Sequence, residues 1–338
     1  MRRFIHHISW LILVVMFYNL RAEEKEKGNS PYRFNELTVF VIPSPVPFDW
    51  SSPSSLTNSF FKGYLSNFMV RDRYLLGHLF VQITTPMLAE PIIAGMRSVS
   101  TREKRVRLFK EKAGLGILGI GFEGRLETME ELIQKIPIYK RRQELASVTF
   151  RINDEAARLI IDFINRFDRP SNEGIRPSEH YGGAFWPLFR NEGAGCTSFG
   201  LAMLELAGIC DMIRSDWKIS VNIPTHLIGG ELNPGHNVRI RDIRAADHWA
   251  GNSKSETFVP FQIYDPSLMY TWIKERVSTP ESPFYDASQG KMPALFVDFR
   301  HVKPPLQKFQ FGERLDENLF INFHKSLHGI RRQDYADD

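Results

Sequence analysis

The chain is organised around one stretch, Asn191-Glu-Gly-Ala-Gly-Cys196-Thr-Ser-Phe-Gly-Leu-Ala-Met-Leu-Glu-Leu-Ala-Gly208. Two glycines precede the cysteine, and apolar residues follow it at helical spacing. This pattern predicts a buried helix over residues 197–207, which Gly208 ends. The apolar positions of the helix are Phe199, Ala202, Met203 and Leu206.

Cys196 stands at the start of this predicted helix. A thiol in a first helical turn faces unpaired backbone N–H groups and the positive end of the helix dipole, and both favour the thiolate. The placement is therefore typical of a nucleophile, and the glycines before it would let a substrate come close. The alternative interpretation is a small buried apolar residue, which most free cysteines are.

The first 22 residues have the pattern of a secretory signal peptide. Arg2 and Arg3 are followed by an apolar run over residues 8–20, and Ala22 is the predicted cleavage point. A run of about 13 residues is too short to span a bilayer comfortably. Cleavage would remove three arginines and no acid, so the formal charge would fall from +4 to +1. We therefore expect an exported protein of the periplasm or cell envelope that does not bind nucleic acid.

Cys196 and Cys210 are the two cysteines of the chain. A helix between them would hold their Cα atoms roughly 20 Å apart. A disulfide allows only about 7 Å. The sequence therefore predicts two free thiols.

We expect a signal peptide (1–22), a flexible lead-in (23–36), a core (37–215) and a strand-rich C-terminal extension (216–338). The charged stretch 101–112 is predicted to be a solvated helix or loop, with contact to a membrane surface as the alternative. The glycine-rich run 114–124 lacks the ending of a phosphate-binding loop and is predicted to be a closely packed turn or strand. Strands are predicted at 37–42, 74–83, 144–152, 217–223, 237–243, 258–264 and 294–299, and helices at 127–136, from 153 and at 267–276.

The predicted strand 74–83 contains a histidine after a glycine. Because strand neighbours alternate, the side chain of His78 should share a face with Phe80 and Gln82. Residues 168–195 form a long loop rich in glycine, proline and aromatic residues, and ordered loops of this length are uncommon without a function. The loop leads directly to Cys196, so we expect Tyr181 and Trp186 to line a substrate site.

The segment Leu76-Gly-His-Leu-Phe-Val81, followed much later by Gly195-Cys-Thr-Ser198, resembles the circularly permuted branch of the NlpC-type papain-like fold. That branch includes lecithin retinol acyltransferase-like proteins and a bacterial exported family with a Gly-His-x-Phe strand and an Asn-Cys-Ser helix start. The landmarks between the two segments also follow the family order, and the resemblance covers residues 74–210. These landmarks are Gly116–Gly124, Arg142-Gln-Glu-Leu145 and the helix after Asn153.

The resemblance implies an α+β fold with an antiparallel sheet packed on the cysteine helix. It also implies hydrolysis or acyl transfer at an amide or ester, through a Cys196 thioester with His78 as the base. Gly195 stands where the family has asparagine, and no motif identifies the residue that orients His78, so Gln82 and Glu90 are both candidates. His236 would be the base in the unpermuted order of the fold.

A cell-envelope peptide or lipid is the expected substrate, and no metal or cofactor is predicted. The alternative function is a non-catalytic envelope binding or scaffold protein on the same fold. The enzyme hypothesis requires His78 and Cys196 to meet at roughly 3 to 5 Å.

Overall fold

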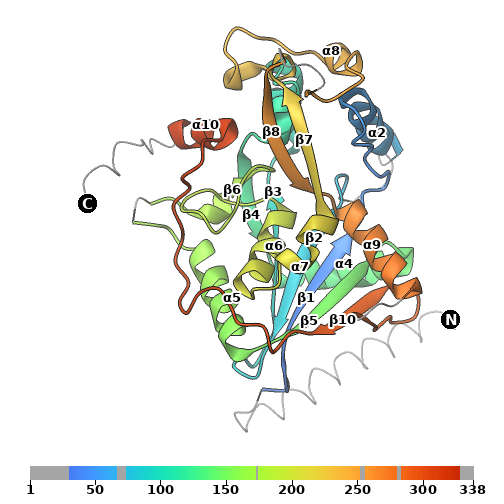
Figure 1. Cartoon of the computed structure of the whole chain (residues 1–338), viewed down its shortest axis with the longest axis vertical. Coiled ribbons are helices and arrows are strands. Elements are labelled where there is room, and N and C mark those ends of the chain that lie inside the picture. The colour runs from blue at the N-terminus through green and yellow to red at the C-terminus, as the bar shows by residue number, and fades with distance from the viewer. Residues whose placement is uncertain (1–29, 67–73, 173, 252–255, 280–282, 328–338) are drawn as a thin grey trace, which may run out of the picture.

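The computed structural model describes residues 30–66, 74–172, 174–251, 256–279 and 283–327, so the predicted signal peptide lies outside the described residues. The fold is mixed α+β, with a mostly antiparallel eight-stranded sheet and a separate hairpin (Figure 1). The main sheet has the order β6-β4-β3-β2-β1-β5-β10-β9, and β7 pairs with β8. The strands are β1 (Asn35–Ile42), β2 (His78–Thr84), β3 (Ile92–Ser98), β4 (Phe122–Glu127), β5 (Ala146–Ile152), β6 (His180–Tyr181), β7 (Lys218–Pro224), β8 (Phe258–Tyr264), β9 (Tyr285–Asp286) and β10 (Ala294–Asp298).

Helices cover both faces of the sheet. In the part of the chain that the structure describes, no helix is long and apolar enough to cross a membrane. The helices are α2 (Pro53–Ser66), α3 (Thr101–Arg105), α4 (Met129–Arg142), α5 (Asp154–Phe167), α6 (Cys196–Leu206), α7 (Asp211–Trp217), α8 (Ile240–Arg244), α9 (Pro266–Ser278) and α10 (Leu319–Leu327), together with a π-helical turn (Val106–Lys110) and short 3-10 turns.

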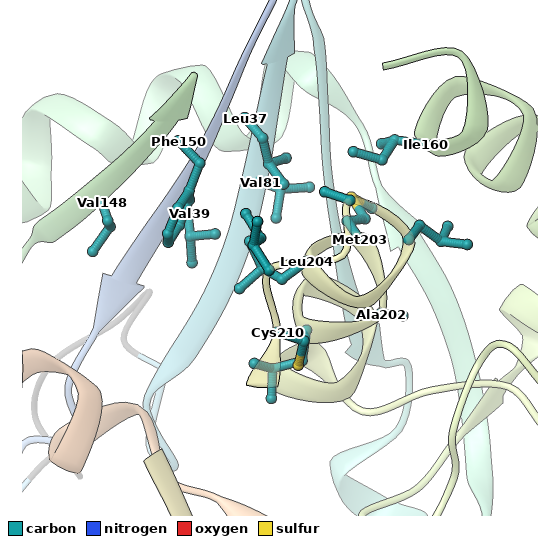
Figure 2. Close-up of a cluster of buried hydrophobic side chains, with 14 of the residues drawn as sticks. Leu37, Val39, Val81, Val148, Phe150, Ile160, Ala202, Met203, Leu204 and Cys210 are labelled. Carbon is teal, nitrogen blue, oxygen red and sulfur yellow. The ribbon is translucent and has the colours of Figure 1, made fainter. Parts of the chain in front are cut away.

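β1 lies at the centre of the sheet, antiparallel to β2 on one side and to β5 on the other. Its β-branched and aromatic run alternates between the two faces, as the pleat requires. Val39 is fully buried on the face that α6 covers, and Figure 2 shows it with Val81 beside Met203 and Leu204 of that helix. Phe40, on the other face, stacks on Phe80 with ring centroids 4.8 Å apart.

The cysteine helix α6 is buried on all sides, which is typical of a helix at the centre of a core. Gly200 brings it close to the sheet, because a Cβ at that position would lie 2.2 Å from Cδ2 of Leu79 on β2. α5 joins α6 in the same core, and its predicted N-cap is confirmed: the Asn153 side chain accepts the N–H of Ala156. The antiparallel sheet therefore packs on the predicted helix.

Two local predictions are wrong. Residues 23–36 were expected to be flexible; residues 23–29 lie outside the described residues, but Asn35 already begins β1 and the Ser30 hydroxyl donates to the carbonyl of Thr85. The predicted strand 237–243 contains helix α8 instead, because the Asp242 carboxylate accepts the N–H of Arg239 and starts a helical turn. Helix α2 begins at Pro53, a position that proline favours.

The region 216–338 contributes strands to two different sheets. β10 pairs in parallel with β5 and extends the main sheet, with β9 at its edge. β7 and β8 form the separate hairpin, whose apolar side chains pack with Leu115, Phe122 and Phe320 in a second core. The glycine-rich run lies beside this core as a packed turn, and a Cβ at Gly119 would be 2.4 Å from the Phe320 ring.

Candidate active site

Cys196 is the first residue of α6, and Gly195 is the N-cap. The loop before it packs tightly on β6: the N–H of Ala194 donates to the carbonyl of His180 at 3.0 Å, and a Cβ at Gly193 would lie 2.1 Å from that oxygen. Gly193 also has a φ of 75°, which disfavours other residues. The glycines thus serve the close packing of the loop that positions the thiol, and Cys196 is only 8 % exposed.

His78 is the first residue of β2 and follows Gly77, which has a φ of 71°. Pairing between β2 and β3 ends at Phe80 and Gly95, and beyond that point β3 pairs with β4 alone. The first residues of β2 are therefore not paired with β3, and the cysteine helix meets them. The backbone N–H of Leu79 and the imidazole of His78 both lie against the thiol of Cys196 and stabilise its thiolate form.

Glu127, the last residue of β4, faces the other side of the imidazole. Its Oε2 lies 2.5 Å from Nε2 of His78, and the carboxylate is fully buried. Neither atom has a well-aligned hydrogen bond, so the contact is a close ion pair. Because Nε2 faces Glu127, Nδ1 is the ring nitrogen left for the thiol. In space, His78 lies between Cys196 and Glu127. This is the arrangement of a nucleophile, a base and a group that orients the base.

Gly95, on the strand β3 that lies between β2 and β4, makes room for this ion pair. A Cβ at Gly95 would lie 3.2 Å from Nε2 of His78 and 3.2 Å from Oε2 of Glu127. A side chain there would push the imidazole and the carboxylate apart. Gly95 is thus part of the construction of the site.

Three further side chains hold Glu127 in place. The Tyr74 hydroxyl donates to its Oε1 at 2.5 Å, and the Lys135 ammonium lies 2.7 Å from the same oxygen. Nη1 of Arg97 is 3.8 Å away. The Tyr74 ring also stacks on the His78 imidazole, with ring centroids 3.9 Å apart. Tyr74 therefore fixes both the carboxylate and the plane of the histidine ring.

The electrostatics of the site favour a thiolate and imidazolium pair. Burial opposes the charged form of His78, but its close contacts with Cys196 and Glu127 and the negative charges of both raise its pKa to about 9. Burial likewise opposes the thiolate of Cys196, and the contact with His78 and the Leu79 N–H lower the pKa of the thiol below its usual value. Despite burial, His78 and Lys135 hold the pKa of Glu127 well below its usual range.

Tyr181 is the predicted substrate-site residue that the structure places at the thiol. Its hydroxyl lies 3.9 Å from Sγ of Cys196, and β6 holds it next to Phe122 on β4. The Lys104 ammonium lies over the Tyr181 ring, 5.3 Å from the centroid. Residues 101–112 were predicted to be solvated, but Lys104 is half-buried.

Trp186 does not reach the thiol, which corrects the second substrate-site prediction. Its ring packs against Tyr264 at 6.1 Å and under the guanidinium of Arg214 at 5.0 Å. Its side chain also faces Glu205. That residue lies nine positions along α6 from Cys196, roughly 13 Å at the helical rise.

The two candidates for the orienting residue are placed elsewhere. Gln82 shares the strand face of His78, as predicted, but four positions along a strand separate the residues by roughly 13 Å. In the sheet, Gln82 stands opposite Thr38 of β1 and Ile93 of β3, away from the histidine. Glu90 is exposed in the turn between β2 and β3, at the far end of that hairpin from His78. Glu127 occupies the position expected for either of them.

His236 does not face the thiol either. It is exposed, and its Nε2 is 2.7 Å from the carbonyl oxygen of His226 in a local turn. The structure therefore brings His78, and not His236, to Cys196.

The sequence prediction missed Glu127, Tyr74 and Lys135. A signal for Glu127 was present, because Thr128 and Glu131 form a capping box that begins α4 and so leaves Glu127 at the end of a strand. Tyr74 and Lys135 have no such local signal, since their roles depend on contacts between the turn before β2, the strand β4 and the helix α4.

Both cysteines are free thiols, as predicted. Cys210 lies in the apolar core, as Figure 2 shows, and burial raises its pKa to about 12.

Within the described residues, no three His, Cys, Asp or Glu side chains are grouped so that they could hold a metal ion. Comparisons with family models, with curated protein sequences and with solved structures found no match.

Proposed function

We propose that the protein is a thiol-dependent hydrolase or acyltransferase that acts on an amide or ester through a thioester on Cys196. The observation that carries the proposal is the contact of Cys196 with His78, whose other ring nitrogen faces the buried carboxylate of Glu127. A cysteine that only fills space in the core needs neither a histidine nor a carboxylate beside it. The antiparallel sheet packed on the cysteine helix supports a circularly permuted papain-like fold for this core.

In the proposed reaction, the Cys196 thiolate attacks the carbonyl carbon and forms a C–S bond. The oxyanion that develops would be stabilised by backbone N–H groups at the start of α6, which have no acceptor within the helix. The His78 imidazolium then donates its proton to the leaving amine or alkoxide, and the C–N or C–O bond breaks.

The thioester is resolved in a second half-reaction. His78, now neutral, takes a proton from water or from an acceptor hydroxyl or amine, which attacks the thioester carbon. The C–S bond breaks and the Cys196 thiolate forms again beside the imidazolium. Glu127 acts as a positioning residue, because it holds the ring and stabilises its positive charge throughout.

The proposed substrate class is inferred from the predicted signal peptide. If residues 1–22 direct export, the substrate is a peptide or lipid of the cell envelope. Tyr181 would contact the acyl group, because its hydroxyl is next to the sulfur.

Mass spectrometry of the intact protein after incubation with p-nitrophenyl acetate tests the proposal. We expect one acetyl group on Cys196 in the wild type, none in Cys196→Ala, and strongly slowed acetylation in His78→Ala. Cys210→Ala is the matched control and should be acetylated like the wild type. Equal acetylation of Cys196 with and without His78 would contradict the enzyme hypothesis and favour a binding or scaffold protein.

A further inference from the structure

Lys104 is a cation beside the thiol site that forms no ion pair with a carboxylate of the described residues. Among the described residues, its ammonium group makes no hydrogen bond and has no carboxylate within ion-pair distance. It lies 5.3 Å from the centroid of Tyr181 and 5.7 Å from that of Phe122. Such contacts between a cation and aromatic faces are weak and use none of the three N–H donors of the ammonium group.

The neighbouring carboxylate is engaged elsewhere. Oε2 of Glu103 accepts the backbone N–H of Glu123 at 3.1 Å, so this side chain is held toward β4. The Ser100 hydroxyl caps α3, which positions both residues on one short helical turn. The turn thus presents Lys104 toward Tyr181 while its adjacent acid is used to anchor the turn.

Lys104 is close enough to the reactive centre for its charge to act there. It interacts electrostatically with Cys196, with the neighbouring Glu103 and with Arg97, and the Tyr181 ring that it covers carries the hydroxyl next to Sγ. Lys104 is half-buried, and this burial lowers its pKa because the ammonium group is less solvated than an exposed one. A poorly solvated cation attracts an incoming anion more strongly than an exposed one does.

We infer that Lys104 determines specificity by binding an oxyanion of the substrate, a carboxylate or a phosphate, close to the acyl carbon that Cys196 attacks. The inference rests on the proposed function and adds to it a substrate class: acyl compounds with a negative charge near the scissile bond. Lysine suits this task as a point charge with three donors that adapts to either anion.

Alkylation of Cys196 by iodoacetate and by iodoacetamide measures this effect without any substrate. The two reagents have nearly the same size and differ in charge, and each transfers its methylene carbon to the sulfur as iodide leaves. The rates are read for the Cys196 peptide by mass spectrometry at pH 7.5, and their ratio reports the attraction for the carboxylate.

We expect the iodoacetate to iodoacetamide ratio to fall at least about threefold in Lys104→Met. Lys104→Arg, which keeps the charge, should stay close to the wild type. Lys110→Met is the matched control, because Lys110 is exposed at the end of the adjoining π-helical turn. Its ratio should be unchanged. A wild-type ratio in Lys104→Met, or a lowered ratio in Lys104→Arg, would overturn the inference while leaving the proposed function intact.

Competition by acetate and by inorganic phosphate at constant ionic strength distinguishes the two anions. The anion that slows alkylation by iodoacetate at the lower concentration, in the wild type but not in Lys104→Met, identifies the group that the site prefers. If neither anion competes, the inference is wrong. If Cys196 reacts with neither reagent faster than Cys210 does, the proposed function itself fails.

Discussion

Replacing Glu127 by glutamine should move the alkaline limit of activity to lower pH. The substitution keeps the shape of the side chain and removes the charge that lies 2.5 Å from Nε2 of His78. An opposite charge at this range raises the pKa of a histidine by about 1–3 units. Lys135 and Arg97 would remain beside the site without their carboxylate and would lower the His78 pKa further.

The size of the effect at one pH follows from these values. With a pKa of about 9, His78 is mostly protonated at pH 8 in the wild type. A fall of two units would reduce the imidazolium from about nine-tenths to about one-tenth of the molecules at that pH. Because the imidazolium protonates the leaving group, hydrolysis of an unactivated ester or amide at pH 8 should fall about tenfold. Near pH 6 the loss should be much smaller.

Two measurements check this prediction. The pH–rate profile of hydrolysis gives the alkaline limb, and an NMR titration of isotope-labelled His78 gives the same pKa without any substrate. Glu131→Gln is the control, since Glu131 pairs with Arg125 at 2.6 Å and makes no contact with His78. An alkaline limb and a His78 titration that stay near pH 9 in Glu127→Gln would refute the role of this carboxylate.

Three other predictions follow from the packing around the site. Gly200→Ala would place a methyl group 2.2 Å from a leucine methyl of β2, so the free energy of unfolding should fall by about 1–3 kcal/mol in denaturant titrations. Arg314→Met would leave the fully buried carboxylate of Glu192 without its ion pair, which should cost about 3–5 kcal/mol of stability. Cys196 should react with iodoacetamide at pH 7.5 much faster than Cys210, whose pKa burial raises to about 12.

Matched variants make each of these tests decisive. Gly63→Ala adds a methyl group at ordinary contact distance, 3.6 Å from Cβ of Val46, and should not destabilise the protein. Arg300→Met breaks an exposed pair with Asp298 and should leave the free energy of unfolding nearly unchanged. Equal losses in test and control variants, or equal alkylation of the two thiols, would contradict the corresponding prediction.

Local patterns were sufficient to predict most elements that frame the site. The β-branched run of β1, the strand β5 and the Asn153 cap each depend on neighbours in sequence, and the structure has all three. The start of α6 at Cys196 followed from glycines and apolar spacing. The alternation of apolar residues over 237–243 wrongly predicted a strand. The structure has helix α8 there, which the Asp242 side chain caps.

The orienting residue could not be found from strand alternation alone. Gln82 satisfied the rule that residues two or four apart share a face, but a shared face does not fix the distance along the strand. Glu127 reaches His78 across two strand pairings, with Gly95 between them. Such a contact depends on sheet order and register, which are tertiary properties that one sequence does not reveal.

The charges around the two cysteines decide between a nucleophile and a small buried apolar residue. Cys210 is surrounded by the apolar core, and burial raises its pKa. Cys196 is similarly buried, yet its pKa is lowered, because His78 and the Leu79 N–H both stabilise the thiolate. Burying that many positive and donor groups is costly unless a negative charge accompanies them. The contacts with His78 and the Leu79 N–H therefore favour the thiolate, which is the form of cysteine that attacks a carbonyl carbon.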